Sequence, residues 1–155
     1  MTIKTTAHLN FRGDARAALE FYRSVFGGQV TIATYGDVGM PSEAPGADNL
    51  VFGQVESADG FRVMAYDIPG LSGGSAAAAG STRRENGTTI TDSPFFVSVR
   101  GESLEEVEGY WSALSVGASI LEPLTASAWS PGFGMLTDSF GVTWILDVAA
   151  DRPAD

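Results

Sequence analysis

The chain has 155 residues, 44% of them hydrophobic and 18% charged, so it is long enough to bury a core and too apolar to be disordered. Its 19 acidic and 9 basic side chains give a net charge of −10, which disfavours binding to the phosphate backbone of nucleic acids. It contains no cysteine, which excludes disulfides and cysteine-ligated metal centres.

The N-terminal sequence lacks the apolar run of a signal peptide. No stretch reaches the roughly 18 apolar residues that a membrane span requires. We therefore expect a cytoplasmic protein that binds neither membranes nor nucleic acids.

The first half of the chain predicts four strands and one helix. Residues 5–12 alternate apolar and polar side chains, which is typical of a strand with Leu9 and Phe11 on one face and His8 on the other. A helix is expected from the N-cap candidate Asp14 until the glycine pair at residues 27–28. The remaining elements are a strand at 29–35, a long loop at 36–49 and a hairpin made by 50–56 and 61–67.

Residues 68–93 differ from the rest of the chain because they are rich in glycine, serine, alanine and threonine. Such side chains are too small to build a core. This composition predicts a linker or a mobile flap.

The second half repeats the order of the first. We expect a helix at about 103–115, with Trp111 facing the core, and a strand containing Trp144 that also faces the core. Trp129 lies in the loop before the last hairpin. The predicted strands are 94–100, 118–122, 133–137 and 142–148.

The two halves are related by an internal repeat with an offset of 88 residues. The sequence FRGD at residues 11–14 reappears as VRGE at 99–102, with apolar, basic, glycine and acidic positions in step. A repeat of this kind buries its apolar face only by pairing. We therefore predict an α+β fold in which residues 1–155 form a single domain. It contains two β-α-β-β-β modules, at about 5–67 and 94–148, which pair into a curved, half-open eight-stranded barrel with the helices outside.

Four segments carry a family resemblance: AHLNFRG at 7–13, ALEFY at 18–22, VFGG at 25–28 and GFGMLTDSFGVTWIL at 132–146. They resemble the vicinal oxygen chelate superfamily, which includes glyoxalase I, the bleomycin-resistance proteins and the extradiol dioxygenases. Within it they are most similar to the PhnB-like subfamily, whose members are often labelled as similar to demethylubiquinone methyltransferase. The resemblance implies a ligand-binding groove on the concave side of the sheets, and a homodimer.

In active members of the superfamily, the resemblance implies metal ligands from a histidine on the first strand of a module and a glutamate on the last. His8 takes the first-strand position, although counting back from residues 21–22 places Ala7 there instead. At the offset of 88 the counterpart of His8 is Phe96. Alignment of the last hairpin turn of each module pairs Met64 with Ile145, and Ile145 falls where the superfamily has its glutamate ligand. We therefore predict no metal and no cofactor, with a partial site completed by Asp147, Glu56 or Glu43 as the alternative.

The predicted concave face is mostly apolar with a few polar groups, as is usual for a small-molecule site. Trp129 and Phe133 could close over a planar ligand, or they could seal the barrel mouth or a dimer contact. His8 is the only histidine, and it is either a general base or a strand residue whose imidazole is satisfied by Asn10 or Tyr66. The candidate ligand-binding residues are His8, Asn10, Phe52, Arg62, Met64, Tyr66, Phe96, Ser98, Trp129, Phe133, Thr143 and Ile145.

These patterns favour a small-molecule binding protein of the glyoxalase/bleomycin-resistance type, with a degenerate metal site and a role in resistance or sequestration. A conventional metal-dependent enzyme is disfavoured. The alternative is a divalent-metal-dependent lyase, isomerase or oxygenase that uses His8 as its catalytic candidate in an unconventional site. A third possibility is a protein–protein scaffold whose groove is filled by its own side chains.

Overall fold

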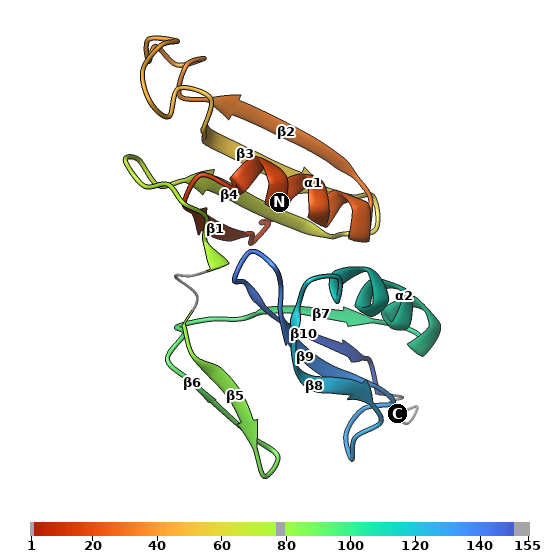
Figure 1. Cartoon of the computed structure of the whole chain (residues 1–155). Coiled ribbons are helices and arrows are strands. Elements are labelled where there is room, and N and C mark those ends of the chain that lie inside the picture. Colours follow the sequence, from red (N-terminus) through yellow and green to blue (C-terminus); the bar gives the residue numbers. More distant parts are fainter. Residues whose placement is uncertain (1, 77–79, 151–155) are drawn as a thin grey trace. The chain divides into compact units, whose positions relative to one another are not determined.

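The computed structural model describes residues 2–76 and 80–150, which fold into two compact units divided after Ser75 (Figure 1). Within these residues the chain forms ten strands and two helices. The protein is therefore of the mixed α+β class, as the sequence predicts.

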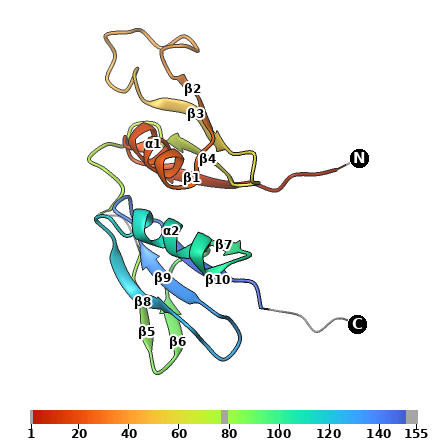
Figure 2. The same cartoon turned by 90° about the vertical axis from the view of Figure 1, so that its right-hand side faces the viewer.

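The first unit is one four-stranded sheet with a helix packed on one face (Figure 2). The strand order is β1-β4-β3-β2, with β1 parallel to β4 and the other neighbours antiparallel. The elements are β1 (Ala7–Phe11), α1 (Ala15–Phe26), β2 (Gln29–Thr34), β3 (Leu50–Glu56) and β4 (Arg62–Asp67).

The second unit contains a sheet of the same topology. Its order is β7-β10-β9-β8, again with one parallel pair, between β7 and β10. The elements are β7 (Val97–Gly101), α2 (Leu104–Leu114), β8 (Ser119–Thr125), β9 (Phe133–Thr137) and β10 (Thr143–Val148).

The segment predicted as a linker or mobile flap contains a β-hairpin that the sequence analysis did not predict. β5 (Thr82–Glu85) pairs with β6 (Thr88–Thr91) across a two-residue turn. Asn86 and Gly87 form the turn with φ values of 51° and 77°, the positive values that an Asn-Gly hairpin turn requires. Residues 77–79 of the predicted linker lie outside the described residues.

Strand boundaries in the second unit also differ from the prediction. The strand expected at 94–100 begins only at Val97, so Phe96 precedes it. Among the described strands β7 pairs only with β10, and the first residue pair of this ladder is Val97 with Trp144, next to the start of β10 at Thr143. β8 continues to Thr125, beyond the predicted end at 122, and its pairing with β9 is irregular on both sides of Glu122.

The helices pack on their sheets at two glycines. A Cβ on Gly53 of β3 would overlap the Leu19 side chain of α1. In the second unit, a Cβ on Gly134 would lie 2.7 Å from the Trp111 ring of α2. Trp144 is fully buried, which confirms its predicted core position.

Asp67, at the end of β4, is a buried junction of the first unit. Its side chain is 1% exposed. One carboxylate oxygen accepts hydrogen bonds from the backbone N–H groups of Gly13 and Ala15 at 2.9 and 3.0 Å, and the other accepts from Leu50 N–H at 2.8 Å. Asp67 therefore joins the β1–α1 connection and the start of β3 to the last residue of β4.

Asp14 occupies the N-cap position of α1 as predicted, but its side chain does not cap the helix. Its carboxylate instead binds the backbone N–H and the hydroxyl of Ser75 at 3.0 and 2.5 Å. The carboxylate of Asp67 accepts from the first N–H of the helix in its place.

Replacing Asp67 with asparagine should destabilise the protein by about 3 kcal/mol, because an amide cannot accept from all three backbone donors and a buried donor left unpaired is costly. Chemical denaturation measures the change. Asp59→Asn, at an exposed turn, is the matched control and should leave stability nearly unchanged. Equal effects of the two substitutions would contradict the role of Asp67.

Gly53→Ala should cost about 1–3 kcal/mol of stability, because the new methyl group overlaps Leu19 and the helix must shift. Gly109→Ala is the matched control, since Gly109 lies in α2 with no atom within 4 Å of its Cβ position. That substitution should stabilise the protein by up to about 1 kcal/mol through helix propensity. Thermal denaturation that moves both variants in the same direction would contradict the packing described.

Candidate functional site

In the first unit, the face of the sheet opposite α1, called here its helix-free face, carries a group of predicted site residues. Register places His8 opposite Met64 and Asn10 opposite Tyr66, while Leu9 on the other face is buried. His8, and not Ala7, therefore lies on the helix-free face. The residues of the prediction found on this face are His8, Asn10, Phe52, Arg62, Met64 and Tyr66.

The imidazole of His8 already has two partners on this face. Its Nδ1 lies 2.9 Å from Oδ1 of Asn10, and its ring meets Tyr66 edge to face at 5.2 Å between centroids. The Asn10 contact is one that the sequence predicts for a histidine at this strand position. This contact involves Nδ1 alone, so Nε2 is the ring nitrogen left for a ligand.

The guanidinium of Arg62 forms hydrogen bonds with the segment that precedes β1. Its Nε donates to the Thr6 hydroxyl, and its Nη2 donates to the Thr5 carbonyl at 3.2 Å. These contacts hold the start of the chain against β4. Arg62 therefore serves the fold, and only Nη1 is left without an acceptor in the part of the chain that the structure describes.

The helix-free face of the second sheet brings together Ser98, Ile145 and Met135 in register across β7, β10 and β9. Thr143 lies on the same face, and its hydroxyl shares a 2.8 Å hydrogen bond with that of Thr137. Met135 is fully buried, although it faces away from α2. Ile145 and Ser98 therefore sit beside an apolar, covered surface.

The ladders correct the predicted counterpart of His8. If Met64 and Ile145 are equivalent, the residue paired with Met64 is His8 and the residue paired with Ile145 is Ser98, not Phe96. The offset of 88 matches Gly13 with Gly101, but these glycines lie at different places relative to their strands. Gly13 lies beyond the end of β1, whereas Gly101 is the last residue of β7. The offset therefore does not align the residues of the two strands. The counterpart of His8 is thus a hydroxyl.

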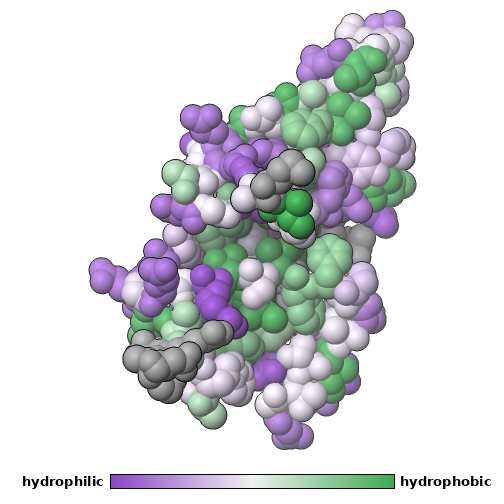
Figure 3. Space-filling model, turned by 180° about the vertical axis from the view of Figure 1, so that it is seen from behind, coloured by the Kyte–Doolittle hydropathy of each residue, from purple (hydrophilic) through white to green (hydrophobic). Residues whose placement is uncertain are grey.

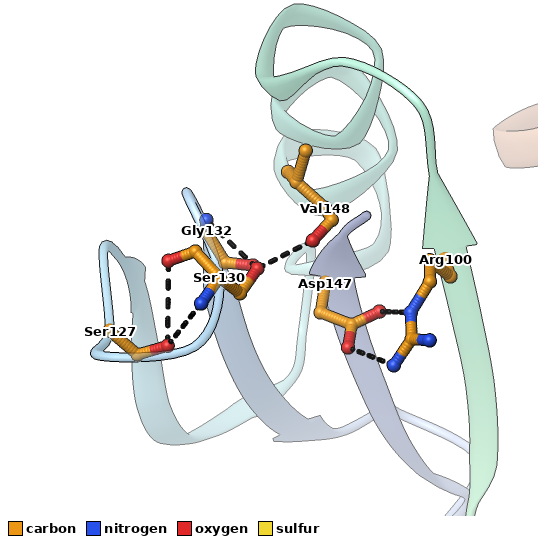
Figure 4. Close-up of polar contacts among 6 residues, drawn as sticks. All are labelled: Arg100, Ser127, Ser130, Gly132, Asp147 and Val148. Carbon is orange, nitrogen blue, oxygen red and sulfur yellow. Dashed lines mark hydrogen bonds and ion pairs between the residues drawn. The ribbon is translucent and has the colours of Figure 1, made fainter. Parts of the chain in front are cut away.

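Asp147 on β10 is held by an ion pair with Arg100 on β7 (Figure 4). Two hydrogen bonds of 3.0 and 2.9 Å join the guanidinium to both carboxylate oxygens, and Asp147 has only 7% of its side chain exposed. The hydrogen bonds and the negative charge of Asp147 raise the pKa of Arg100. The carboxylate is therefore already neutralised by the protein.

The loop before β9 is anchored by Ser130, which is buried (Figure 4). Its hydroxyl lies 2.6 Å from the carbonyl oxygens of Gly132 and Val148, and Ser127 accepts from its backbone N–H at 3.1 Å. This anchoring ties the loop that carries Trp129 to the end of β10.

Trp129 and Phe133 form an aromatic pair, with ring centroids 5.5 Å apart at 68°. Hydrophobic side chains reach the surface at several places (Figure 3). Trp129 is exposed, at 58%. Phe133 is also contacted by Arg84 of β5, whose guanidinium carbon lies 5.4 Å from the centroid of the phenyl ring. Sequence reasoning missed Arg84, because the segment that carries it was interpreted as a linker.

The profile of the Glyoxalase/Bleomycin resistance protein/Dioxygenase superfamily matches residues 5–146. The chain belongs to this superfamily. Protein YjdN of Escherichia coli strain K12 is 24% identical over 150 residues, which cover 94% of this chain and 95% of YjdN. These matches confirm the predicted superfamily.

Solved structures agree with this assignment. Protein PA1353 from Pseudomonas aeruginosa superposes with a TM-score of 0.73 and 26% identity, covering 97% of this chain and 100% of that one. The PhnB protein from Bacillus cereus, described as a putative 3-demethylubiquinone-9 3-methyltransferase, has a TM-score of 0.65 and 24% identity over 95% of this chain and 100% of its own. The PhnB-like resemblance is thereby confirmed at the level of fold.

The divalent ion expected in active superfamily members does not fit the donors present. Within residues 2–76 and 80–150, no three histidine, aspartate or glutamate side chains gather closely enough to hold an ion. The carboxylates considered for a partial site have other partners. Asp147 binds Arg100, Glu56 binds Lys4 and Gln54, and Glu43 accepts from Ser42.

Neither α1 nor α2 is long and apolar enough to cross a bilayer.

Tyr35, which follows β2, was not singled out from the sequence. Its hydroxyl donates to the backbone carbonyl of Asp67 at 2.7 Å. Burial raises the pKa of Tyr35, and the neighbouring Tyr66 and Asp67 raise it further. The phenol therefore keeps its proton, and its hydrogen bond to Asp67, to a higher pH than a tyrosine with an ordinary pKa.

This raised pKa makes the contribution of Tyr35 to stability depend on pH. The unfolded chain loses the phenol proton near its ordinary pKa of 10.0, before the folded protein does, so the contribution is complete below that pH and is lost above it. Tyr35→Phe should cost about 1 kcal/mol at neutral pH through the missing hydrogen bond. In urea denaturation at a series of pH values, the difference from wild type should narrow as the pH rises beyond 10.0. A constant difference would contradict this account.

Proposed function

We propose that this superfamily member binds a small organic molecule at the helix-free faces of its sheets, without a divalent cation. The observation that carries the proposal is that polar side chains on these faces already have hydrogen-bond or ion-pair partners within the protein. The Asp147 carboxylate and Nδ1 of His8 are paired with protein groups, whereas several rings and apolar side chains are not enclosed. Superfamily membership further supports a cytoplasmic homodimer.

The first helix-free face supports binding through its rings and its polarisable groups. Phe52 on β3 is 36% exposed. Met64 and Tyr66 are partly exposed on the adjacent strand, next to the imidazole of His8. Aromatic rings and a thioether make favourable contacts with a flat organic ligand, and the polar tips of Tyr66 and His8 can orient it.

The second helix-free face supports the same kind of ligand. Phe133 and Trp129 supply rings, and Ser98 supplies a hydroxyl beside Ile145. Asp147 is unavailable to an ion because Arg100 neutralises it through both carboxylate oxygens. A cation would have to displace this guanidinium before it could bind.

One observation favours a second function. Nε2 of His8 has no hydrogen-bond acceptor or donor in the part of the chain that the structure describes. A ligand that brings its own oxygen donors could complete an ion site there, which would make the protein a metal-dependent lyase, isomerase or oxygenase.

A thermal-shift titration of untagged, chelator-treated full-length protein separates these functions. Nickel, zinc, manganese and ferrous ions should leave the melting temperature unchanged, whereas a bound ion at a hundred-fold excess over its Kd would stabilise the fold by about 2.7 kcal/mol. A shift that disappears in His8→Ala would establish the metal enzyme instead. A shift that persists in His8→Ala would place the ion elsewhere and would equally contradict the proposal.

A further inference from the structure

We propose that Arg84, Phe133 and Trp129, called here the ring–guanidinium cluster, bind the carboxylate and the ring of a planar aromatic acid. This inference rests on the proposed small-molecule function and names the class of its ligand. All three side chains belong to the second unit, and consecutive contacts of 5.4 and 5.5 Å link guanidinium, phenyl ring and indole.

Arg84 is poorly paired for a buried cation. Its side chain is only 13% exposed, yet its contact with Glu122 is a single Nε to Oε2 approach of 3.4 Å. Arg100 is 65% exposed and makes two bonds of 3.0 and 2.9 Å to one carboxylate. The more buried guanidinium therefore has the weaker ion pair, the reverse of what stability alone would favour.

Arg84 also keeps hydrogen-bond donors for a ligand. Nη1 donates to the Thr89 hydroxyl at 2.9 Å, and the described residues provide no acceptor for Nη2. No fully buried side-chain nitrogen or oxygen among them lacks a partner, so Nη2 must reach solvent. Two parallel N–H groups from one guanidinium match the two oxygens of a carboxylate.

The rings beside Arg84 specify the rest of the ligand. Phe133 contacts both the guanidinium of Arg84 and the indole of Trp129. Trp129 is 58% exposed, and Ser130 anchors its loop from the adjacent position. A flat ring can therefore stack on an aromatic surface that is already in place, which reduces the entropy lost on binding.

The surrounding charge limits the ligand to a single negative charge. Glu122 is 37% exposed and lies 3.4 Å from the guanidinium, so a dianion would be repelled at close range. The net charge of −10 adds a longer-range repulsion that salt screens. An aromatic monocarboxylate fits these limits, and a polyphosphate does not.

Isothermal titration of the full-length protein with 2-naphthoate and 2-naphthamide tests the proposal, because the two probes share a ring and differ in charge. Wild type should bind naphthoate about ten times more tightly or better. Arg84→Gln should remove this preference while naphthamide binding persists, which also shows that the variant is folded. Arg83→Gln makes the same charge change on the exposed neighbour and should keep the preference.

A second variant tests the ring part of the site. Trp129→Ala, at an exposed position, should weaken both probes by a similar factor and leave their ratio unchanged. Three results would overturn the proposal: no naphthoate binding, equal affinities for both probes in wild type, or an undiminished preference in Arg84→Gln. Naphthoate binding that is lost on adding a chelator would instead contradict the metal-free function and leave the role of Arg84 intact.

Discussion

The packing of one helix against one face of each four-stranded sheet determines which side chains are available for function. Gly53 and Gly134 let Leu19 and Trp111 approach the sheets closely, and strand alternation then assigns every neighbouring side chain to one face or the other. His8 and Arg100 lie on the faces that no helix covers because Leu9 and Val99 point the other way. The proposed small-molecule function rests on those two faces.

On those faces, several polar groups already have protein partners. Asp147 is bound by Arg100, and the Nδ1 side of His8 is bound by Asn10. Members of one superfamily can share a fold and differ in chemistry, since chemistry depends on the donors at the site. In the proposed function, the Asp147 carboxylate serves a structural contact in place of an ion, and rings and apolar side chains bind the ligand.

Local patterns allowed the helices and most strands to be predicted, because their apolar residues recur at a fixed period. The contact between His8 and Asn10 was also predictable, since residues two apart on a strand share a face. The hairpin that carries Arg84 was missed because its strands are polar and have no apolar period, although Asn86-Gly87 is a strong turn signal. The role of Asp67 depends on backbone groups far away in the sequence, which no local pattern contains.

The central claim is that this superfamily member works without a divalent ion. Elemental analysis of untagged protein, purified without chelator and dialysed against buffer, tests it most directly. The account predicts that each of nickel, zinc, manganese and iron is present at well below one ion per chain. A single metal retained at one ion per chain, and lost in His8→Ala, would contradict it.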